Sequence, residues 1–169
     1  MIALDYINCT GHRNVLAKHQ TTLEITKENY LTPRGDCIVC INSNKGAKDL
    51  SDNVKSILKT EGYGYLVLLK DGLMDVISGR GSQNLTFTSE VKMIVRKSDF
   101  ISDATILIKA NKSAKDLRRD LVLRLKEGIA LALIIASEKP LHDEEILRVI
   151  IDSLPASVKL PEFINYSLK

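Results

Sequence analysis

The sequence predicts an α+β fold, in which about eight strands form a β-rich barrel or sandwich with two internal helices and one C-terminal helix. Three observations support this prediction. Short apolar or alternating segments of strand length recur along the chain. Other segments carry apolar residues at the spacing of one helix face. A unit of strand, polar turn, strand and helix occurs twice, which indicates an internal repeat.

The expected elements follow from these patterns in chain order. The expected strands are Ile2–Cys9, Val15–Thr26, Cys37–Asn42, Tyr63–Lys70, Leu73–Ser78, Leu85–Val95, Ala104–Lys109 and Ile129–Ala136. The expected helices are Ala47–Thr60, Ala114–Glu127 and His142–Leu154. Between the fourth and fifth strands, Asp71-Gly72 predicts a hairpin turn, because glycine tolerates the positive φ that such a turn requires.

The repeat is most visible in two seven-residue segments. Asn44–Leu50 returns as Asn111–Leu117 with six of seven residues identical, at an offset of 67 residues. The flanking patterns also match, so we expect two units, at about residues 17–58 and 86–126, related by a pseudo-twofold rotation. Each segment is interpreted as a helix start. The alternative is a phosphate site, in which helix amides act beside Lys45 or Lys112.

The chain should form one core domain over residues 1–138, with residues 139–169 as a C-terminal helical appendage. The N-terminus lacks the pattern of a signal peptide, and the longest apolar run is too short to span a membrane. We therefore expect a cytoplasmic protein without a membrane partner. Three cysteines do not make a disulfide framework, and strand periodicity sends Cys37 and Cys40 to opposite faces, so all three are expected to be core residues.

Charge is distributed unevenly along the chain. The net charge is +3, but Lys92–Lys126 holds ten Lys and Arg against four Asp, which is +6 locally. This asymmetry fits an anionic partner, although a solvated lysine-rich face is the simpler interpretation. If its cations share a face with Arg34 and Arg80, that face suits a phosphate backbone. Aromatic residues are scarce, so any nucleic-acid binding should depend on the backbone and on salt rather than on base stacking.

Polar chemistry is concentrated between Gly11 and Asp36, inside segments that otherwise resemble buried strand. His12, His19 and Asp36 are candidates for acid–base catalysis or for binding a divalent metal. Their spacing matches no compact metal motif. A histidine on the apolar face of a strand, as expected for His19, is also commonly a hydrogen-bonded core residue.

Basic side chains on stiff turns are candidates for anion recognition. Pro33-Arg34-Gly35 should present a guanidinium outward, where it could contact a carboxylate or phosphate in bidentate fashion. Arg96-Lys97 occupies the corresponding place in the second unit, and Gly79–Ser82 forms a third basic turn. The chain has no P-loop, HExxH or GxGxxG motif.

Together these residues resemble an archaeal family catalogued as domain of unknown function 371. The resemblance covers about residues 6–136 and is carried by six segments: Gly11–Val15, His19–Thr22, Leu31–Cys37, Arg96–Phe100 and the two Asn-Lys-x-Ala-Lys-Asp-Leu motifs. It implies an archaeal cytosolic protein with a compact β-rich fold, helices and no established activity. The site residues that it implies are His12, His19, Thr21, Thr22, Arg34, Gly35, Asp36, Arg96 and Lys97.

Three functions compete at this stage. The first is a binding module for an anionic partner, either nucleic acid or a phosphorylated ligand, in which Arg34, Gly35, Arg96, Lys97, Thr21 and Thr22 bind the ligand. The second is a metal-dependent hydrolase or nuclease that uses His12, His19 and Asp36. The third is a structural or assembly protein. Whether the protein is an enzyme, and its oligomeric state, stay open.

Overall fold

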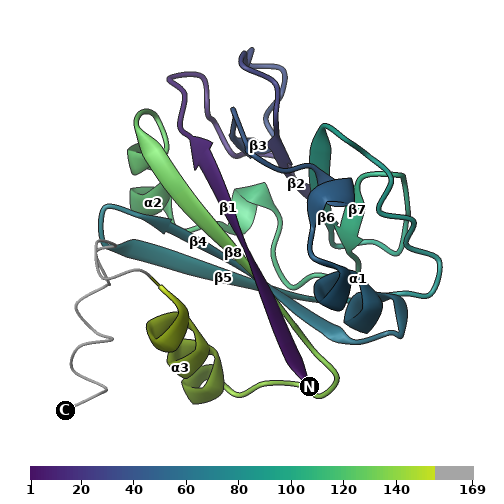
Figure 1. Ribbon diagram of the computed structural model, residues 1–169. Helices are drawn as coiled ribbons and strands as arrows, with labels where there is room; N and C mark the ends of the chain where they lie inside the picture. The colour runs from purple at the N-terminus through teal and green to yellow at the C-terminus, as the bar shows by residue number, and fades with distance from the viewer. Residues whose placement is uncertain (155–169) are drawn as a thin grey trace.

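A computed structural model of the protein describes residues 1–154, and eight strands form two four-stranded sheets. Sheet A is antiparallel, in the order β1-β8-β4-β5 (Figure 1). Its strands are β1 (Ile2–Thr10), β4 (Tyr63–Lys70), β5 (Leu73–Arg80) and β8 (Ile129–Ser137). The expected α+β class and the eight strands are therefore confirmed.

Sheet B has the order β3-β2-β6-β7, in which the central pair β2–β6 is antiparallel and the outer pairs are parallel. Its strands are β2 (Thr22–Thr26), β3 (Ile38–Cys40), β6 (Lys92–Arg96) and β7 (Thr105–Leu107). Single bridges, Thr10 to Ile41 and Arg80 to Ile108, link the edges of the two sheets. The pairing does not close into one barrel, so the barrel part of the prediction is not confirmed.

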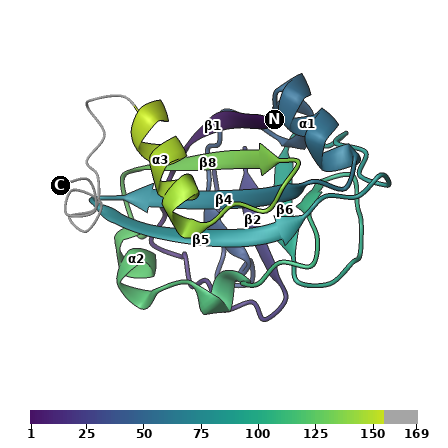
Figure 2. The ribbon, with the colours of Figure 1, turned by 90° about the horizontal axis from the view of Figure 1, so that it is seen from below.

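The main core fills the space between the sheets, and two helices lie at its opposite ends (Figure 2). These are α1 (Asp52–Lys59) and α2 (Arg119–Arg124), each preceded by a short 3₁₀ helix, η1 (Ala47–Asp49) or η2 (Ala114–Asp116). Their apolar stripes, such as Val54, Ile57 and Leu58 in α1, are buried in this core. The expected helices 47–60 and 114–127 thus each divide into a 3₁₀ turn and a shorter α-helix.

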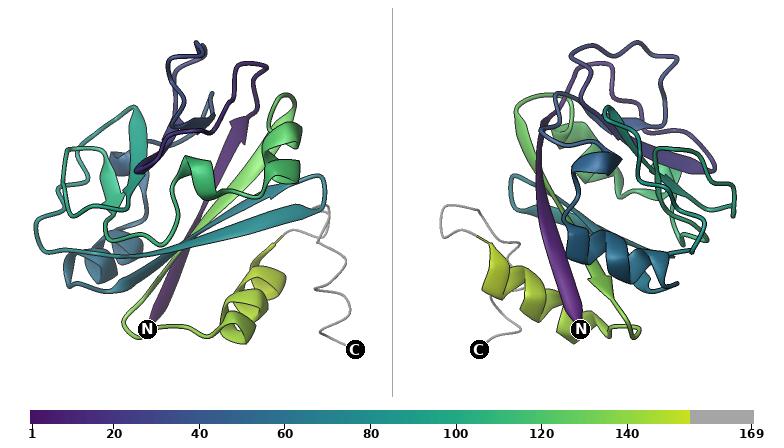
Figure 3. Two further views of the ribbon diagram at one scale, coloured as in Figure 1. Left: turned by 180° about the vertical axis from the view of Figure 1, so that it is seen from behind. Right: turned by 45° about the vertical axis from the view of Figure 1, so that its right-hand side comes forward.

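The third helix, α3 (Asp143–Ser153), packs on the other face of sheet A (Figure 3). Ile146 and Ile150 enter a second apolar cluster with residues of β4, β5 and β8. The helix confirms the expected element at 142–154, whereas residues 155–169 of the expected appendage lie outside the described residues. Among residues 1–154 no helix is both long and apolar enough to cross a membrane.

The β4–β5 hairpin follows its prediction closely. Tyr63–Lys70 is the strand that was expected, and Asp71 and Gly72 both have positive φ, +52° and +80°. A two-residue turn of this kind matches the twist of the flanking strands. The pairing of Lys70 with Leu73 fixes the register of all eight residue pairs along the hairpin.

Two expected strands are much shorter than the apolar pattern indicated. Val15–Thr26 contains strand only at Thr22–Thr26, and Leu85–Val95 pairs only from Lys92. In each case a residue with positive φ interrupts the extended chain, Ala17 at +49° and Phe87 at +51°. These side chains are buried, so the hydrophobic pattern continues through a segment that is not strand.

The two halves of the chain carry the same elements in the same order. Each half runs strand, strand, strand, 3₁₀ helix, α-helix, strand, from β1 to β4 and from β5 to β8. Exchanging the halves leaves the strand order of both sheets unchanged, and β2–β3 and β6–β7 share the same irregular parallel pairing. Superposition of the halves by a rotation stays a prediction.

The cysteines differ from expectation in two respects: two of them form a disulfide, and Cys37 is not part of the core. Cys9 and Cys40 are buried, as expected, but they form a disulfide between the end of β1 and the end of β3. Cys37 is free and half-buried, on the other side of the strand from Cys40. Burial, followed by the nearby Glu24 carboxylate, raises the pKa of the Cys37 thiol.

Candidate ligand-binding cavity

A cavity of about 670 Å³ lies on the outer face of sheet A, beside strand β5. Its floor comes from β4 and β5, one wall from the start of α3, and the other wall from the segment that precedes η2. Its volume falls within the range of small-molecule sites. The lining residues that bear polar or charged groups are Tyr63, Tyr65, Asp75, Ser78, Arg80, Lys109, Asn111, Lys112 and Asp143.

The floor follows from the register of the hairpin. Tyr63 pairs with Arg80 and Tyr65 pairs with Ser78, so these four side chains share the outer face of the sheet. The Tyr65 hydroxyl accepts a hydrogen bond of 2.7 Å from the Leu141 backbone amide. This bond fixes the chain at the entrance to α3 and thereby positions the wall of the cavity.

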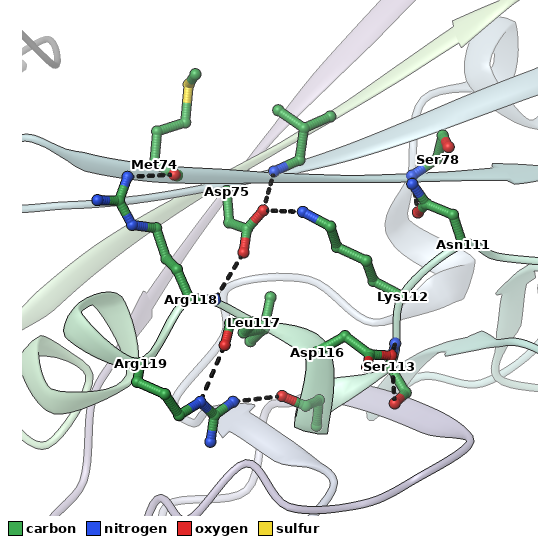
Figure 4. Close-up of polar contacts among 12 residues, drawn as sticks. Met74, Asp75, Ser78, Asn111, Lys112, Ser113, Asp116, Leu117, Arg118 and Arg119 are labelled. Atoms are coloured by element: carbon green, nitrogen blue, oxygen red, sulfur yellow. Dashed lines mark hydrogen bonds and ion pairs between the residues drawn. The ribbon is translucent and has the colours of Figure 1, made fainter.

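The opposite wall is held against the free edge of β5. Arg80 and Ile108 exchange two backbone hydrogen bonds of 2.8 and 2.9 Å. Two residues earlier on β5, the Ser78 backbone amide donates a hydrogen bond to Asn111 Oδ1 at 2.9 Å (Figure 4). Between these anchors lies Lys109, an exposed residue in the left-handed region at φ +51°. The anchors hold its Cα beside the cavity.

A buried ion pair closes the inner side of this wall (Figure 4). The Asp75 carboxylate accepts hydrogen bonds from Lys112 Nζ and, at 2.9 Å, from the Arg118 backbone amide. Asp75 is 8% exposed, so its charge depends on these partners rather than on water. The pair fixes the start of α2 to β5.

The first half of the chain contains the same arrangement. Asp5 accepts from Lys45 Nζ and, at 2.8 Å, from the Ser51 backbone amide, which precedes α1. The Asn44 side chain accepts from the Asn8 amide of β1, as Asn111 accepts from Ser78. The repeated Asn-Lys pair therefore ties each helix start to a strand. This confirms the interpretation of the motif as a helix start, although its asparagines bind strand amides rather than cap helices.

Two cations of the cavity, Arg80 and Lys109, have no charged counterpart at the matching positions of the first half. Thr10 and Ile41 exchange two backbone hydrogen bonds, as Arg80 and Ile108 do. Asn42, which follows Ile41, has a φ of +53°, and Lys109, which follows Ile108, has a φ of +51°. The first half thus places threonine and asparagine where the second half places two cations. The first pair of positions shows that this backbone arrangement forms without a charged side chain.

Arg80 is held in a defined orientation. Its guanidinium carbon lies 4.1 Å from the centroid of the Tyr63 ring, and Nη2 donates to the Glu61 carbonyl oxygen at 2.9 Å. Arg80 Nε is buried and, within residues 1–154, has no hydrogen-bond partner. Buried N–H groups are normally paired, so Arg80 Nε is an exception among the described residues.

Each of the two predicted histidines accepts a hydrogen bond from a backbone amide within its own turn. His12 Nδ1 accepts from the Asn14 amide at 3.0 Å, and His19 Nδ1 accepts from the Thr22 amide at 3.1 Å. In the second half Ser82 and Ser89 hydroxyls do the same for Asn84 and Lys92. Because a neutral imidazole with an accepting Nδ1 carries its proton on Nε2, each ring presents one further N–H.

Asp36 contributes its backbone to the structure. Its carbonyl oxygen accepts from the amides of Lys18 and His19 at 3.0 and 3.3 Å, and Asp103 has the same role in the second half. Within the described part of the chain, no three His, Cys, Asp or Glu residues are grouped so that they could hold a metal ion. The predicted metal set of His12, His19 and Asp36 is therefore not brought together.

The remaining predicted ligand-binding residues divide between exposed and engaged groups. Arg34 is exposed on its turn, where the Gly35 amide donates to the Thr32 carbonyl at 3.0 Å. Thr21 is exposed, and the Thr22 hydroxyl lies 2.9 Å from His19 Nδ1. The turn at Arg34 thus has the form that the sequence predicted, and its role in binding stays a prediction.

Arg96 and Lys97 have structural partners. Arg96 donates to the Thr105 and Ser102 hydroxyls and lies over the Phe100 ring, and burial lowers the pKa of its guanidinium. Lys97 forms an ion pair of 2.7 Å with Asp116. That pair, together with the Ser113 amide, lowers the pKa of Asp116 to about 2.

Several other cations of the basic segment are also engaged. Arg118 pairs with Asp120, Arg119 donates to four backbone carbonyls, and Lys126 donates to the Val15 carbonyl. Most of the cations behind the local charge of +6 therefore have partners inside the protein. Most of these contacts hold turns and helix ends in place.

The sequence predicts a basic turn at Gly79–Ser82, whereas Arg80 ends strand β5. No sequence motif indicates a role for Lys109 or Tyr63. The signal that could have found them is a difference between the halves of the chain: aligning the halves sets Arg80 against Thr10 and Lys109 against Asn42. A charge that only one half carries marks a candidate site.

Comparison with known proteins places this geometry in context. The sequence model of a family described as a domain of unknown function (DUF371) matches residues 7–138. An uncharacterized protein of Methanocaldococcus jannaschii is 44% identical over 122 residues, which are 72% of this chain and 90% of the relative. The family match includes the floor and the cationic wall of the cavity, and it ends before α3.

Proposed function

We propose that this chain, which belongs to the family of the domain of unknown function (DUF371), is a binding module for a small anionic ligand. The proposed site is the cavity beside β5, and its ligand carries a phosphate or a carboxylate. The observation that carries the proposal is the pair Arg80 and Lys109, two cations that line one cavity where the first half of the chain has Thr10 and Asn42.

The chemistry of the pair supports this assignment. Arg80 is already oriented by the Tyr63 ring and the Glu61 carbonyl, so it can bind an oxyanion with little loss of side-chain freedom. Lys109 is exposed on the same cavity and adds a second positive charge. The nearby acid Asp75 is already neutralised by Lys112. The exposed Asp143 lies on the α3 wall.

A small ligand is favoured over nucleic acid. Backbone-driven binding to nucleic acid needs several free cations on one face. Arg96, Lys97, Lys112, Arg118, Arg119 and Lys126 already have partners inside the protein. A cavity with two convergent cations suits one phosphate or carboxylate group better than a long polyanion.

The test is a calorimetric titration of the protein with phenyl phosphate and with benzoate. Lys109→Asn introduces the residue found at the matching position 42 and should preserve the fold. It should weaken binding by about 1.5–3 kcal/mol, the value of a charge-assisted hydrogen bond. Lys115→Asn, at an exposed lysine outside the cavity, is the matched control and should leave binding unchanged.

Arg80→Thr extends the test in the same way, because threonine occupies the matching position 10. It should abolish measurable binding, and its melting temperature shows whether the strand has kept its structure. Binding that is equal in the wild type, Lys109→Asn and Arg80→Thr would refute the proposal. Salt-dependent binding of RNA or duplex DNA without binding of either small anion would favour the nucleic-acid function instead.

A further inference from the structure

The cavity continues into a second, smaller one of about 240 Å³. Both are lined by Met74, Val76, Asp143 and Ile146, and Leu147 lines only the smaller one. Because they share these residues, the two cavities are adjoining parts of one groove between β5 and α3. The groove is therefore longer than a phosphate group requires.

The register of the hairpin gives this groove a gradient of polarity. On the outer face the residue pairs along the strands are Tyr63–Arg80, Tyr65–Ser78, Val67–Val76 and Leu69–Met74. The first pair bears a cation, whereas the last two are apolar. Met74 and Arg80 are six residues apart on one strand, which is about 20 Å at the usual rise per residue.

The apolar end of the groove, near Met74, is lined by side chains of the second apolar cluster, some of which stay partly exposed. Met74 belongs to the second apolar cluster, and Val76 and Leu147 pack against that cluster while remaining partly exposed. Among the described residues, the only charged one that lines the smaller cavity is Asp143, which would repel an anion there. An anionic group is therefore directed to Arg80 and Lys109, and an uncharged chain to Met74.

We infer that the ligand is a single-chain amphiphile, whose anionic head binds at Arg80 and Lys109 and whose hydrocarbon chain lies along β5 beneath α3. This inference rests on the proposed function, because the head uses the same two cations. It adds the chemical class of the remainder of the ligand. Alkyl and prenyl chains share this chemistry, and the head is a phosphate or a carboxylate.

A series of alkyl phosphates tests the inference by calorimetry at concentrations below micelle formation. Affinity should rise from butyl to decyl phosphate by roughly two- to fourfold for each methylene that is buried. Decyltrimethylammonium, with the same chain and a cationic head, should not bind. A parallel series of alkyl carboxylates shows which head is preferred.

The outcomes separate the two proposals. Phosphate binding that depends on Lys109 but does not change with chain length would overturn the inference and leave the proposed function intact. No binding of any alkyl or aryl anion would overturn both. Equal binding of the cationic and anionic amphiphiles would mean that the groove binds hydrocarbon without recognising a head, which also overturns both.

A filled groove provides the complementary test. Leu147→Trp should occupy the smaller cavity and lower the affinity for decyl phosphate at least tenfold, with little effect on butyl phosphate. Ile151→Trp is the matched control on α3, since Ile151 packs against the same cluster and lines neither cavity. If Leu147→Trp lowers the melting temperature strongly, Leu147→Gln replaces it. Unchanged chain-length dependence in a folded Leu147 variant would overturn the inference.

Discussion

Replacing Asp75 with alanine should lower the free energy of unfolding substantially, because its carboxylate holds the start of α2 against β5. Asp75 is 8% exposed and accepts hydrogen bonds from Lys112 Nζ and the Arg118 amide. A hydrogen bond to a charged group is worth about 1.5–3 kcal/mol, and an orphaned buried amide costs about 1–3 kcal/mol. Lys112 keeps 32% of its side chain exposed and can be rehydrated, so we expect a loss of about 3 kcal/mol.

The first half of the chain supplies an internal standard for this value. Asp5 has the same two kinds of partner, Lys45 Nζ and the Ser51 amide. Asp5→Ala should therefore cost about as much as Asp75→Ala, within about 1 kcal/mol. Asp75→Asn, which can still accept from the Arg118 amide, should cost less than Asp75→Ala.

The assay is urea unfolding of each variant, followed by circular dichroism and fitted with a common m-value. The double variant of Asp75 and Lys112 should lose much less than the sum of the single variants, because the two side chains form one interaction. A loss below about 1 kcal/mol for Asp75→Ala, beside a loss near 3 kcal/mol for Asp5→Ala, would refute the reasoning. Asp75 would then belong to the site rather than to the fold.

Three further expectations concern other contacts. The folded pKa of Asp116, about 2, lies below its ordinary value of 3.8, so its stabilisation is complete above about pH 4 and is lost as the pH falls towards 2. Asp116→Asn should remove about 1 kcal/mol at pH 7 after solvent screening and flatten the acid limb of stability measured from pH 2 to 5. Reduction of the Cys9–Cys40 disulfide, which closes a loop with a sequence separation of 31 residues, should lower the unfolding free energy by about 2–4 kcal/mol in urea titrations with and without reductant. His19→Ser introduces the residue found at the matching position 89, whose hydroxyl accepts the same kind of hydrogen bond. Its free energy of unfolding should exceed that of His19→Ala by about 1 kcal/mol. Equal melting temperatures of the two variants would contradict the role of the imidazole in the turn.

The elements that could be predicted from the sequence are those whose pattern is local. The hairpin at Asp71-Gly72 is encoded by two turn residues between two apolar runs, and its strands were predicted to within two residues. Val15–Thr26 was predicted too long because Ala17 adopts positive φ, and an alanine gives no sign of such a conformation. Apolar residues on either side of it stay buried, so periodicity alone cannot detect the break.

Features that depend on packing between distant segments could not be predicted. The Cys9–Cys40 disulfide joins the ends of strands from different sheets, and nothing in the spacing of the cysteines indicates this pairing. The cavity combines Arg80 and Lys109 with α3, so it exists only once sheet A and the helix are assembled. The density of polar residues between 11 and 36 led to a candidate site whose histidines bond their own turns.

The central claim is that the cations found in one half only, Arg80 and Lys109, form the binding site. Mapping of amide chemical shifts by ¹⁵N-labelled NMR during a titration with phenyl phosphate tests it most directly. We predict saturable shifts at Tyr63, Arg80, Lys109 and Leu141, with small changes elsewhere. Shifts confined to the turns around His12, His19 and Arg34 would contradict the claim and return the site to the segment that the sequence indicated.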